Sequence, residues 1–243
     1  MRHGARRALK IVGILLGVLV LYVAAAGAWA YTVTPTVVAR ASKDARVDLR
    51  AFPDSTVEIL LRVEDPNFRK HKGLDLFTPG QGRATLTRSL ARVLYLYRYD
   101  LDGAAGIAQT AFRFVDKFTG PANFAPDAMA LILNRRVRKD QQIKLFIQHA
   151  YMGTQDGQPV YGLANAARVY FGKRRARDLS RRYVIVLVGM MVSPDRFHPI
   201  DHPDALGDRA LRIERLLRRQ CAPRGMTDVY YSDCAQARRS ASR

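Results

Sequence analysis

Glu64 occupies a position that an amphipathic helix would normally give to an apolar side chain. Val57 and Leu60 precede it at three- and four-residue spacing, so its carboxyl group lies at the end of the apolar face. Burial disfavours the charged form of a carboxylate and raises its pKa, as a general acid or base working near neutral pH requires. The structural alternative is a carboxylate at a helix end that pairs with Arg69 or Lys70, because such ion pairs are common without any catalytic role.

A loop that contains glycine and proline, over residues 76–82, leads into an apolar-periodic stretch over 83–96 that predicts a helix. The N-terminus of a helix offers free backbone N–H groups and the positive end of the helix dipole, so we expect an anion site there. Glycines in the loop would let a substrate approach the backbone. The alternative is an arginine-bearing amphipathic helix whose charged face is simply solvated.

The helices that hold these residues can be bounded from the sequence. Ser55 and Glu58 predict a capping box at the start of the first one, and Pro66 predicts its end just before that residue. A later helix begins near Asp127, which suits its first turn because acids are favoured there. With 243 residues, 48% of them apolar, the chain can bury one sizeable core, which predicts one globular domain plus an anchor.

The anchor is predicted from Ile11 to Ala30, where no charged residue occurs. At about 1.5 Å per residue, this run spans roughly 30 Å, the thickness of the hydrocarbon core of a bilayer. The basic residues before it predict a cytoplasmic N-terminus and an exported body. A cleaved signal peptide is the alternative, since Ala28-Trp29-Ala30 resembles a small-x-small cleavage site, but the apolar run is longer than a usual signal core.

The chain is strongly basic, with 40 Lys and Arg against 21 Asp and Glu and a net charge of +19. This excess predicts an anionic partner, which could be nucleic acid, a membrane surface or a substrate that bears pyrophosphate. Export of the body argues against nucleic acid. Cys221 and Cys234 predict a disulfide in an oxidising compartment, because no histidine stands at the spacing that a zinc site needs.

Residues 64–75 resemble the first signature of the family-51 glycosyltransferases, the enzymes that polymerise lipid II into peptidoglycan glycan strands. That signature is a Glu-Asp pair followed at fixed spacing by Phe, His, Gly and Asp, and this sequence has all six as Glu64, Asp65, Phe68, His71, Gly73 and Asp75. In the family the glutamate is the catalytic base, so the resemblance implies this role for Glu64 and places Phe68 beside the substrate. His71 has no closed set of metal-ligating partners, which favours a structural histidine.

Residues 82–96 resemble the second signature of the same family through Gly82, Thr85, Leu86, Thr87 and Leu90. The resemblance implies that Thr85 and Thr87 bind substrate. It also implies that Arg92, which replaces a lysine of the family, contacts pyrophosphate, for which a guanidinium is suited. The neighbouring positions depart from the signature, and the segment between the two signatures is shorter than in the family.

The family also carries a second glutamate that assists at the pyrophosphate end, and two residues compete for its place here. Gln109 stands there if residues 107–112 are matched, whereas Asp127 lies beside the position counted back from the next signature. A glutamine can bind and orient but cannot hold a proton or a metal as a carboxylate does. Further on, the resemblance implies a packed helical lobe in which Lys139 also meets the pyrophosphate.

The resemblance covers Val57 to Leu217 and implies a mainly α-helical, lysozyme-like glycosyltransferase domain with one N-terminal transmembrane helix. The expected divisions are a cytoplasmic basic N-terminus at 1–10, an anchor at 11–31, a connector at 32–53, the glycosyltransferase-like domain at 54–217 and a basic tail with a disulfide at 218–243. The implied protein is a single-pass inner-membrane enzyme with a periplasmic catalytic domain. It polymerises lipid II onto a growing glycan chain, works beside cell-wall assembly proteins and binds no nucleic acid.

No cofactor is certain from the sequence, and a divalent cation, magnesium or manganese, stays open. The departures in the second and third signatures also keep two other functions open. One is a non-catalytic scaffold that binds lipid II or glycan during cell-wall assembly. The other is a lysozyme-like hydrolase of the same fold class.

Overall fold

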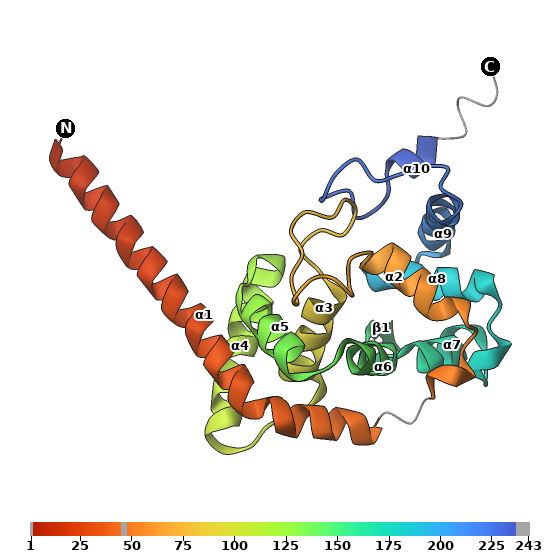
Figure 1. The fold of residues 1–243 in the computed structure, drawn as a ribbon, viewed down its shortest axis with the longest axis horizontal. Coiled ribbons are helices and arrows are strands. Elements are labelled where there is room, and N and C mark those ends of the chain that lie inside the picture. Colours follow the sequence, from red (N-terminus) through yellow and green to blue (C-terminus); the bar gives the residue numbers. More distant parts are fainter. Residues whose placement is uncertain (1, 45–47, 237–243) are drawn as a thin grey trace.

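The computed structural model describes residues 2–44 and 48–236. Helices make up most of this part of the chain, and one long N-terminal helix projects from a body in which the other elements are packed (Figure 1). The predicted mainly α-helical fold is confirmed.

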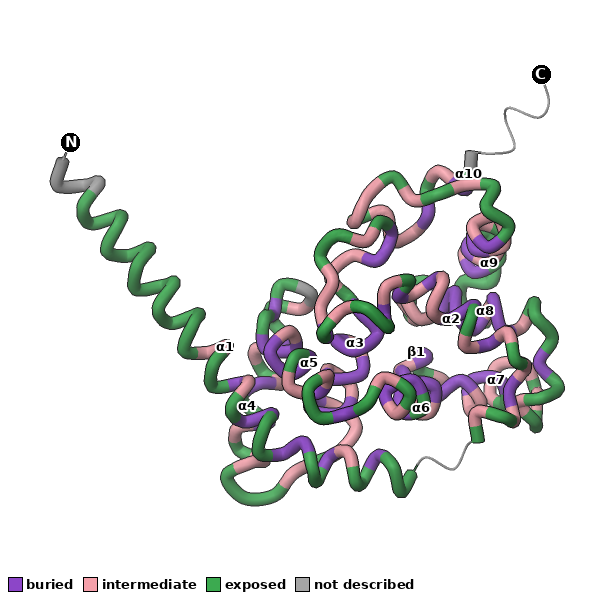
Figure 2. The backbone as a smooth tube through the Cα atoms, in the orientation of Figure 1, coloured by how far each residue is buried: buried purple, intermediate pink, exposed green. Residues whose placement is uncertain are grey.

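The first helix, α1 (Arg2–Asp44), joins the predicted anchor and most of the predicted connector in one element. Residues 6–21 are exposed throughout, and the helix is long and apolar enough to cross a membrane. Beyond them, one stripe packs on the body through Ala26, Ala30, Val33, Val37 and Ala41, at three- and four-residue spacing (Figure 2). Pro35 lies inside the helix, and Figure 1 shows α1 bending along the body.

The body has two groups of helices on either side of the candidate site. The first contains α3 (Leu86–Arg92), α4 (Gly103–Thr119) and α5 (Ala125–Arg136), and α1 packs on α4 and α5. In the second, α2 (Ser55–Glu64) packs on α8 (Arg181–Met191) and α9 (Pro203–Leu217). Their buried apolar residues form one continuous core.

Further elements connect the two groups. Helix α6 (Lys139–His149) contacts α3 on one side and α7 (Leu163–Phe171) on the other. Strands β1 (Tyr151–Gln155) and β2 (Gln158–Tyr161) form an antiparallel hairpin with Tyr151 opposite Tyr161. The short elements are η1 (Leu49–Ala51), the π-helical η2 (Val93–Arg98), η3 (Gly120–Ala122), η4 (Ala176–Asp178) and α10 (Asp233–Gln236).

The helix that carries Glu64 ends as predicted, but its predicted capping box is not formed. Ser55 lies inside α2, behind the N-cap Asp54, so its side chain is one position too late to cap. Glu58 instead pairs with Arg62 at 3.7 Å, one turn further along the helix. The helix predicted over 83–96 begins later than expected, at Leu86 of α3. Its α-helical part ends at Arg92, and the chain continues as π-helical η2.

The residues after α9, 218–236, fold back on the body and are called the C-terminal segment below. The predicted disulfide between Cys221 and Cys234 is present in it. Figure 1 shows this segment beside the loop that precedes α3. Backbone hydrogen bonds join the two, because Gly80 N donates to Gly225 O and Gly82 N to Met226 O, each at 2.8 Å.

Candidate active site

Glu64 is the last residue of α2, and its side chain turns into the interior between the two helix groups. Its Oε1 atom is enclosed and has no hydrogen-bond partner among the described residues. Burial raises the pKa of Glu64 to about 7, with a smaller lowering effect of Arg209 and a raising effect of Asp65. The predicted partly desolvated carboxylate is therefore present.

The other polar residues of the first signature hold the backbone around Glu64. The fully buried carboxylate of Asp65 accepts hydrogen bonds from Leu86 N at 2.9 Å and from Nε2 of His71 at 2.9 and 3.0 Å. Nδ1 of His71 accepts from Gly73 N at 3.0 Å, so both ring nitrogens are used. His71 is thus the structural histidine that the sequence favours.

Two cavities meet at Glu64. One, of about 320 Å³, is lined by Glu64, Arg88 and Arg92 together with Met191 and Tyr151. One cavity thus joins the carboxylate of Glu64 to Arg92. The other, of about 220 Å³, is lined by Glu64, Gln81, Arg209, Tyr230 and Tyr231 among others.

The two arginines of the larger cavity are held by acids, one buried (Asp116) and one partly buried (Asp127). Arg92 donates to Asp116 from Nε at 2.9 Å and lies 2.8 Å from it through Nη2. Arg88 donates to Asp127 from Nε at 2.7 Å and to the carbonyl of Asn123 at 2.9 Å. Such charge-assisted bonds fix the direction in which each guanidinium points, so the cavity has a positively charged wall of defined shape.

Two of the backbone donors at the start of α3, where we expected an anion site, already have partners within the protein. Leu86 N is taken by Asp65, and Arg88 N donates to Oγ1 of Thr85 at 3.0 Å. With these first-turn donors already used, the arginine side chains remain as the anion-binding groups.

Asp127, one of the two candidates for the second carboxylate, lies in the first turn of α5. Besides Arg88, it accepts a hydrogen bond from Nη2 of Arg83 at 2.6 Å. It does not line either cavity at Glu64. Its position suits a residue that orients the arginines.

Gln109, the other candidate, lies inside the first helix group and is 1% exposed. Its amide nitrogen donates to the carbonyls of Tyr95 and Tyr99 at 2.6 and 2.7 Å, and its Oε1 accepts from Leu101 N at 3.0 Å. The amide therefore holds the turn after η2 in the described structure, and a contact of Gln109 with substrate stays a prediction.

The remaining predicted substrate-binding residues lie behind the cavity walls. Thr85 donates to the carbonyl of Gly73 and Thr87 to Oε1 of Gln142, at 2.6 and 2.7 Å. Nζ of Lys139 lies 4.2 Å from the centre of the Phe68 ring. None of these four predicted residues lines either cavity at Glu64, so the structure places them in a supporting position.

Lys139 nonetheless has an unusual setting. Its Nζ atom is enclosed and has no hydrogen-bond partner among the described residues. Burial lowers the pKa of Lys139 to about 8, against the raising effect of Asp65.

Four residues of the site were not singled out from the sequence: Arg88, Asp116, Arg209 and Tyr231. A signal for Arg209 did exist, because it falls between Leu206 and Ile213 on the apolar stripe of α9 and is 1% exposed. The proximity of Tyr231 depends on how the C-terminal segment folds back, for which the sequence has no periodic pattern.

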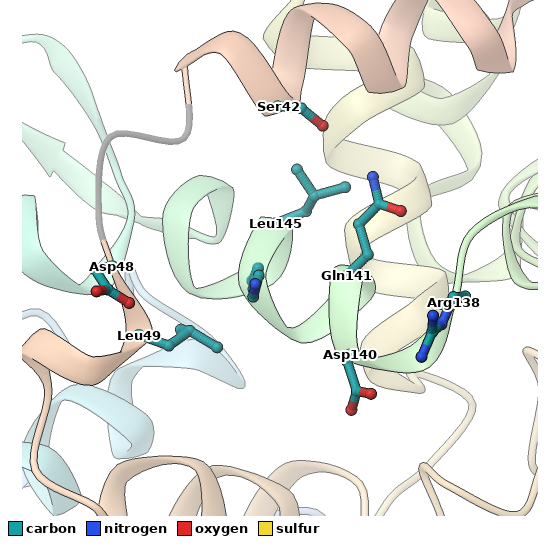
Figure 3. A pocket seen from close by; sticks show the side chains of 8 residues that line it. Ser42, Asp48, Leu49, Arg138, Asp140, Gln141 and Leu145 are labelled. Carbon is teal, nitrogen blue, oxygen red and sulfur yellow. The ribbon is translucent and has the colours of Figure 1, made fainter.

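A larger cavity, of about 600 Å³, lies elsewhere, between the end of α1 and helix α6 (Figure 3). Asp48, Arg138, Asp140 and Lys144 around it are exposed. Because a solvated charge keeps its ordinary reactivity, the smaller cavities at Glu64 are the better candidates for chemistry.

The chemistry of the donors does not favour a divalent cation at this site. Within residues 2–44 and 48–236, no group of three or more His, Cys, Asp or Glu side chains is arranged to hold a metal ion. Asp116 and Asp127, the acids nearest the arginine wall, are already bound to guanidinium groups. The magnesium or manganese ion left open by the sequence has no fitting set of ligands among these residues.

Comparison with known proteins adds an independent observation. A family model described as Transglycosylase matches residues 32–218. The chain is 30% identical over 182 residues to penicillin-binding protein 1B of Escherichia coli, covering 70% of this chain and 19% of that protein. It is 28% identical over 172 residues to penicillin-binding protein 1A of Pseudomonas aeruginosa, covering 69% and 19%. The chain thus aligns with about a fifth of the length of these relatives.

Proposed function

The chain belongs to the transglycosylase family, and on this premise we propose that it is a peptidoglycan glycosyltransferase that polymerises lipid II, with Glu64 as the general base. The observation that carries the proposal is the enclosed carboxylate of Glu64 at the edge of a cavity with an arginine wall. Its raised pKa suits a base near neutral pH.

In the proposed reaction, the acceptor lipid II presents the 4-hydroxyl of its sugar to Glu64. The carboxylate takes the hydroxyl proton as the oxygen attacks the anomeric carbon of the growing chain. The bond from that carbon to undecaprenyl pyrophosphate breaks, and the diphosphate leaves with its electron pair. Arg88 and Arg92 meet the developing negative charge, and preorganised cations of this kind supply a large part of the rate enhancement of many enzymes.

A membrane location follows from the same proposal, because both substrates carry lipid tails. The exposed first part of α1 would cross the inner membrane, with Arg6, Arg7 and Lys10 on the cytoplasmic side and the body on the periplasmic side. The contacts of Ala26, Trp29 and Ala30 with the body support a retained helix over a cleaved signal.

The body itself would enter the lipid next to α1. The hydroxyl of Tyr22 donates to Asn123 at 3.0 Å, just beyond the end of α4, so this part of the body lies beside the apolar half of the helix. Phe114 and Phe118 on α4 are 63% and 76% exposed. The two rings contact each other at 4.7 Å between centres, and we expect lipid to cover this exposed aromatic pair.

The deciding experiment is a lipid II polymerisation assay on the full chain in liposomes. Glu64→Gln is expected to lower the rate by about 10²-fold or more, the usual loss for a general base. Glu58→Gln is the matched control, since Glu58 lies exposed on the same helix, and it should retain the wild-type rate. Equal rates for Glu64→Gln and the wild type would contradict the proposed base.

The second candidate is a scaffold that binds lipid II without turnover. It is favoured by one observation, that Asp127 is already bound by two arginines and Gln109 by three backbone groups. Lipid II binding without glycan polymer, unchanged by Glu64→Gln, would select the scaffold. Release of soluble muropeptides from sacculi would select a hydrolase.

A further inference from the structure

We infer that the C-terminal segment is a wall of the active site, and that Tyr231 in this segment and Arg209 of α9 are positioning residues for Glu64. The inference rests on the proposed role of Glu64 as the base. The transglycosylase match ends at residue 218, so all of the segment after its first residue lies outside the part of the chain that the family model covers.

The segment occupies the glycine-containing loop that we expected to receive substrate. Besides the two backbone hydrogen bonds to Gly80 and Gly82, its side chains pack directly on these glycines. A Cβ atom on Gly80, whose φ is +78°, would lie 2.7 Å from Cε1 of Tyr231 and 2.8 Å from Pro223. Only glycine fits there, so the loop is shaped for the segment.

Tyr231 joins the segment to α9 and α2, both of which belong to the second helix group. It is 2% exposed, and its ring centre lies 4.4 Å from the guanidinium carbon of Arg209. Its hydroxyl donates to the carbonyl of Val63, the residue before Glu64. The disulfide between Cys221 and Cys234 closes the chain around Tyr231 and limits its movement away from α2.

Arg209 provides the opposite charge. Its Nε and Nη1 atoms are buried without a hydrogen-bond partner in the described chain, as is Oε1 of Glu64. Both residues line the cavity of about 220 Å³. A buried cation with spare donors beside a buried carboxylate attracts the charged form of that carboxylate. Arg209 thereby keeps the carboxylate of Glu64 turned toward this cavity.

The C-terminal segment and Arg209 shift the pKa of Glu64 in opposite directions. Enclosure, to which the segment contributes, disfavours the carboxylate, whereas Arg209 favours it. The other groups that face Glu64 are Asp65 beside it and Tyr231 in the segment, and Arg83, Arg88 and Arg92 line the walls across the two cavities. Opening the segment and removing the charge of Arg209 should therefore move the titration of Glu64 in opposite directions.

The test compares Arg209→Leu, Arg209→Lys, Tyr231→Phe, Tyr231→Leu and the double variant Cys221→Ser/Cys234→Ser in the full chain. Thr227→Ala is the control, because Thr227 is exposed in the same segment. Two quantities are measured against pH: the rate of lipid II polymerisation, and the titration of Glu64 by infrared difference between each protein and its Glu64→Gln counterpart.

Arg209→Leu is expected to raise the midpoint of the Glu64 titration by about one pH unit. The rate at pH 7 should then fall about fivefold, with KM within about twofold of the wild-type value, and the rate should recover at high pH. Arg209→Lys keeps the charge and should keep the midpoint. Tyr231→Leu and the double serine variant should lower the midpoint, because Glu64 becomes solvated. Tyr231→Phe, the variant that disturbs the fold least, should lower kcat with KM unchanged.

Rates that fall equally at every pH, with all midpoints at the wild-type value, would overturn the inference and leave a purely structural role. The infrared titration separates this result from failure of the proposed function. If the midpoints move as expected but the wild type forms no polymer, the positioning of Glu64 stands and the polymerase does not.

Discussion

At the scale of single residues, Glu64 is a carboxylate in a place where ionisation costs the folded protein free energy. Its pKa is about 7 in the folded state, against an ordinary value of 4.5. Between these two values the folded protein binds the proton and the unfolded chain does not. Stability therefore falls as the pH rises through this window and is lowest above the folded pKa. Active sites commonly carry such a cost.

Glu64→Gln is accordingly expected to stabilise the protein above the window and to have little effect below it. The gain at about pH 8 would be up to about 3 kcal/mol in the free energy of unfolding. Chemical unfolding at about pH 8 and about pH 4 measures it, with Glu58→Gln as the exposed control. A gain of the same size at both pH values would mean that the pKa of Glu64 is not raised.

Asp127 gives a second prediction, because Arg88 is only 6% exposed and would lose its carboxylate partner. Asp127→Ala should lower the free energy of unfolding by about 3 kcal/mol, since a buried charge is left uncompensated. Asp140→Ala, which removes an exposed pair with Arg69 at 3.1 Å, should cost less than about 1 kcal/mol. If Asp127→Ala abolishes polymerisation but leaves the free energy of unfolding unchanged, Asp127 would instead be the second catalytic carboxylate.

The burial of Glu64 could be predicted because its carboxylate stands in the apolar stripe of its helix, at three- and four-residue spacing from the apolar residues before it. Arg209 follows the same rule on α9, and applying the rule to cations as well as acids would have found it. The position of Gln109 could not be found in this way. Its partners are backbone groups brought together by the π-helical turn η2, and no side-chain pattern encodes such a turn.

At the scale of elements, α1 is part of the fold as well as an anchor. Trp29 lies on its packed stripe, where its ring contacts those of Tyr95 and Phe112 at 6.1 and 5.2 Å between centres. Its Nε1 donates to the carbonyl of Ala105 at 3.1 Å. The helix therefore fixes α4 and η2, which stand behind the arginine wall.

Trp29→Ala is expected to lower the free energy of unfolding by about 3–5 kcal/mol, the usual cost of removing a large buried aromatic side chain. Leu16→Ala, in the exposed part of the same helix, should leave it within about 0.5 kcal/mol. Denaturant unfolding in detergent micelles compares the two. Equal effects would show that the packed half of α1 contributes nothing to the body.

The boundary between anchor and domain was the least predictable part of the architecture. Hydropathy changes near Tyr31, where threonines begin, and this suggests a connector. No helix-breaking pair of residues stands there, however, and the helix runs on to Asp44. A helix stops where its backbone can no longer continue, and a change of solvent does not by itself end it.

At the scale of the whole molecule, the depth of the body in the membrane can be measured with a natural probe. Trp29 is the only tryptophan of the chain. With the spanning segment in α1, it should lie near the outer edge of the hydrocarbon core. Lipids brominated near the headgroup are expected to quench its fluorescence more than lipids brominated at the chain ends. The reverse order would place the body at a different depth from the one we propose.

The cysteine bridge beside Tyr231 has a consequence for when a newly made copy becomes competent. Thiols stay reduced in the cytoplasm and are oxidised only in compartments such as the periplasm. If the bridge completes the surroundings of Glu64, maturation would have to wait for translocation. A copy still on the cytoplasmic side of the membrane would be inactive. Its activity would begin only when Cys221 and Cys234 are oxidised to the disulfide in the periplasm.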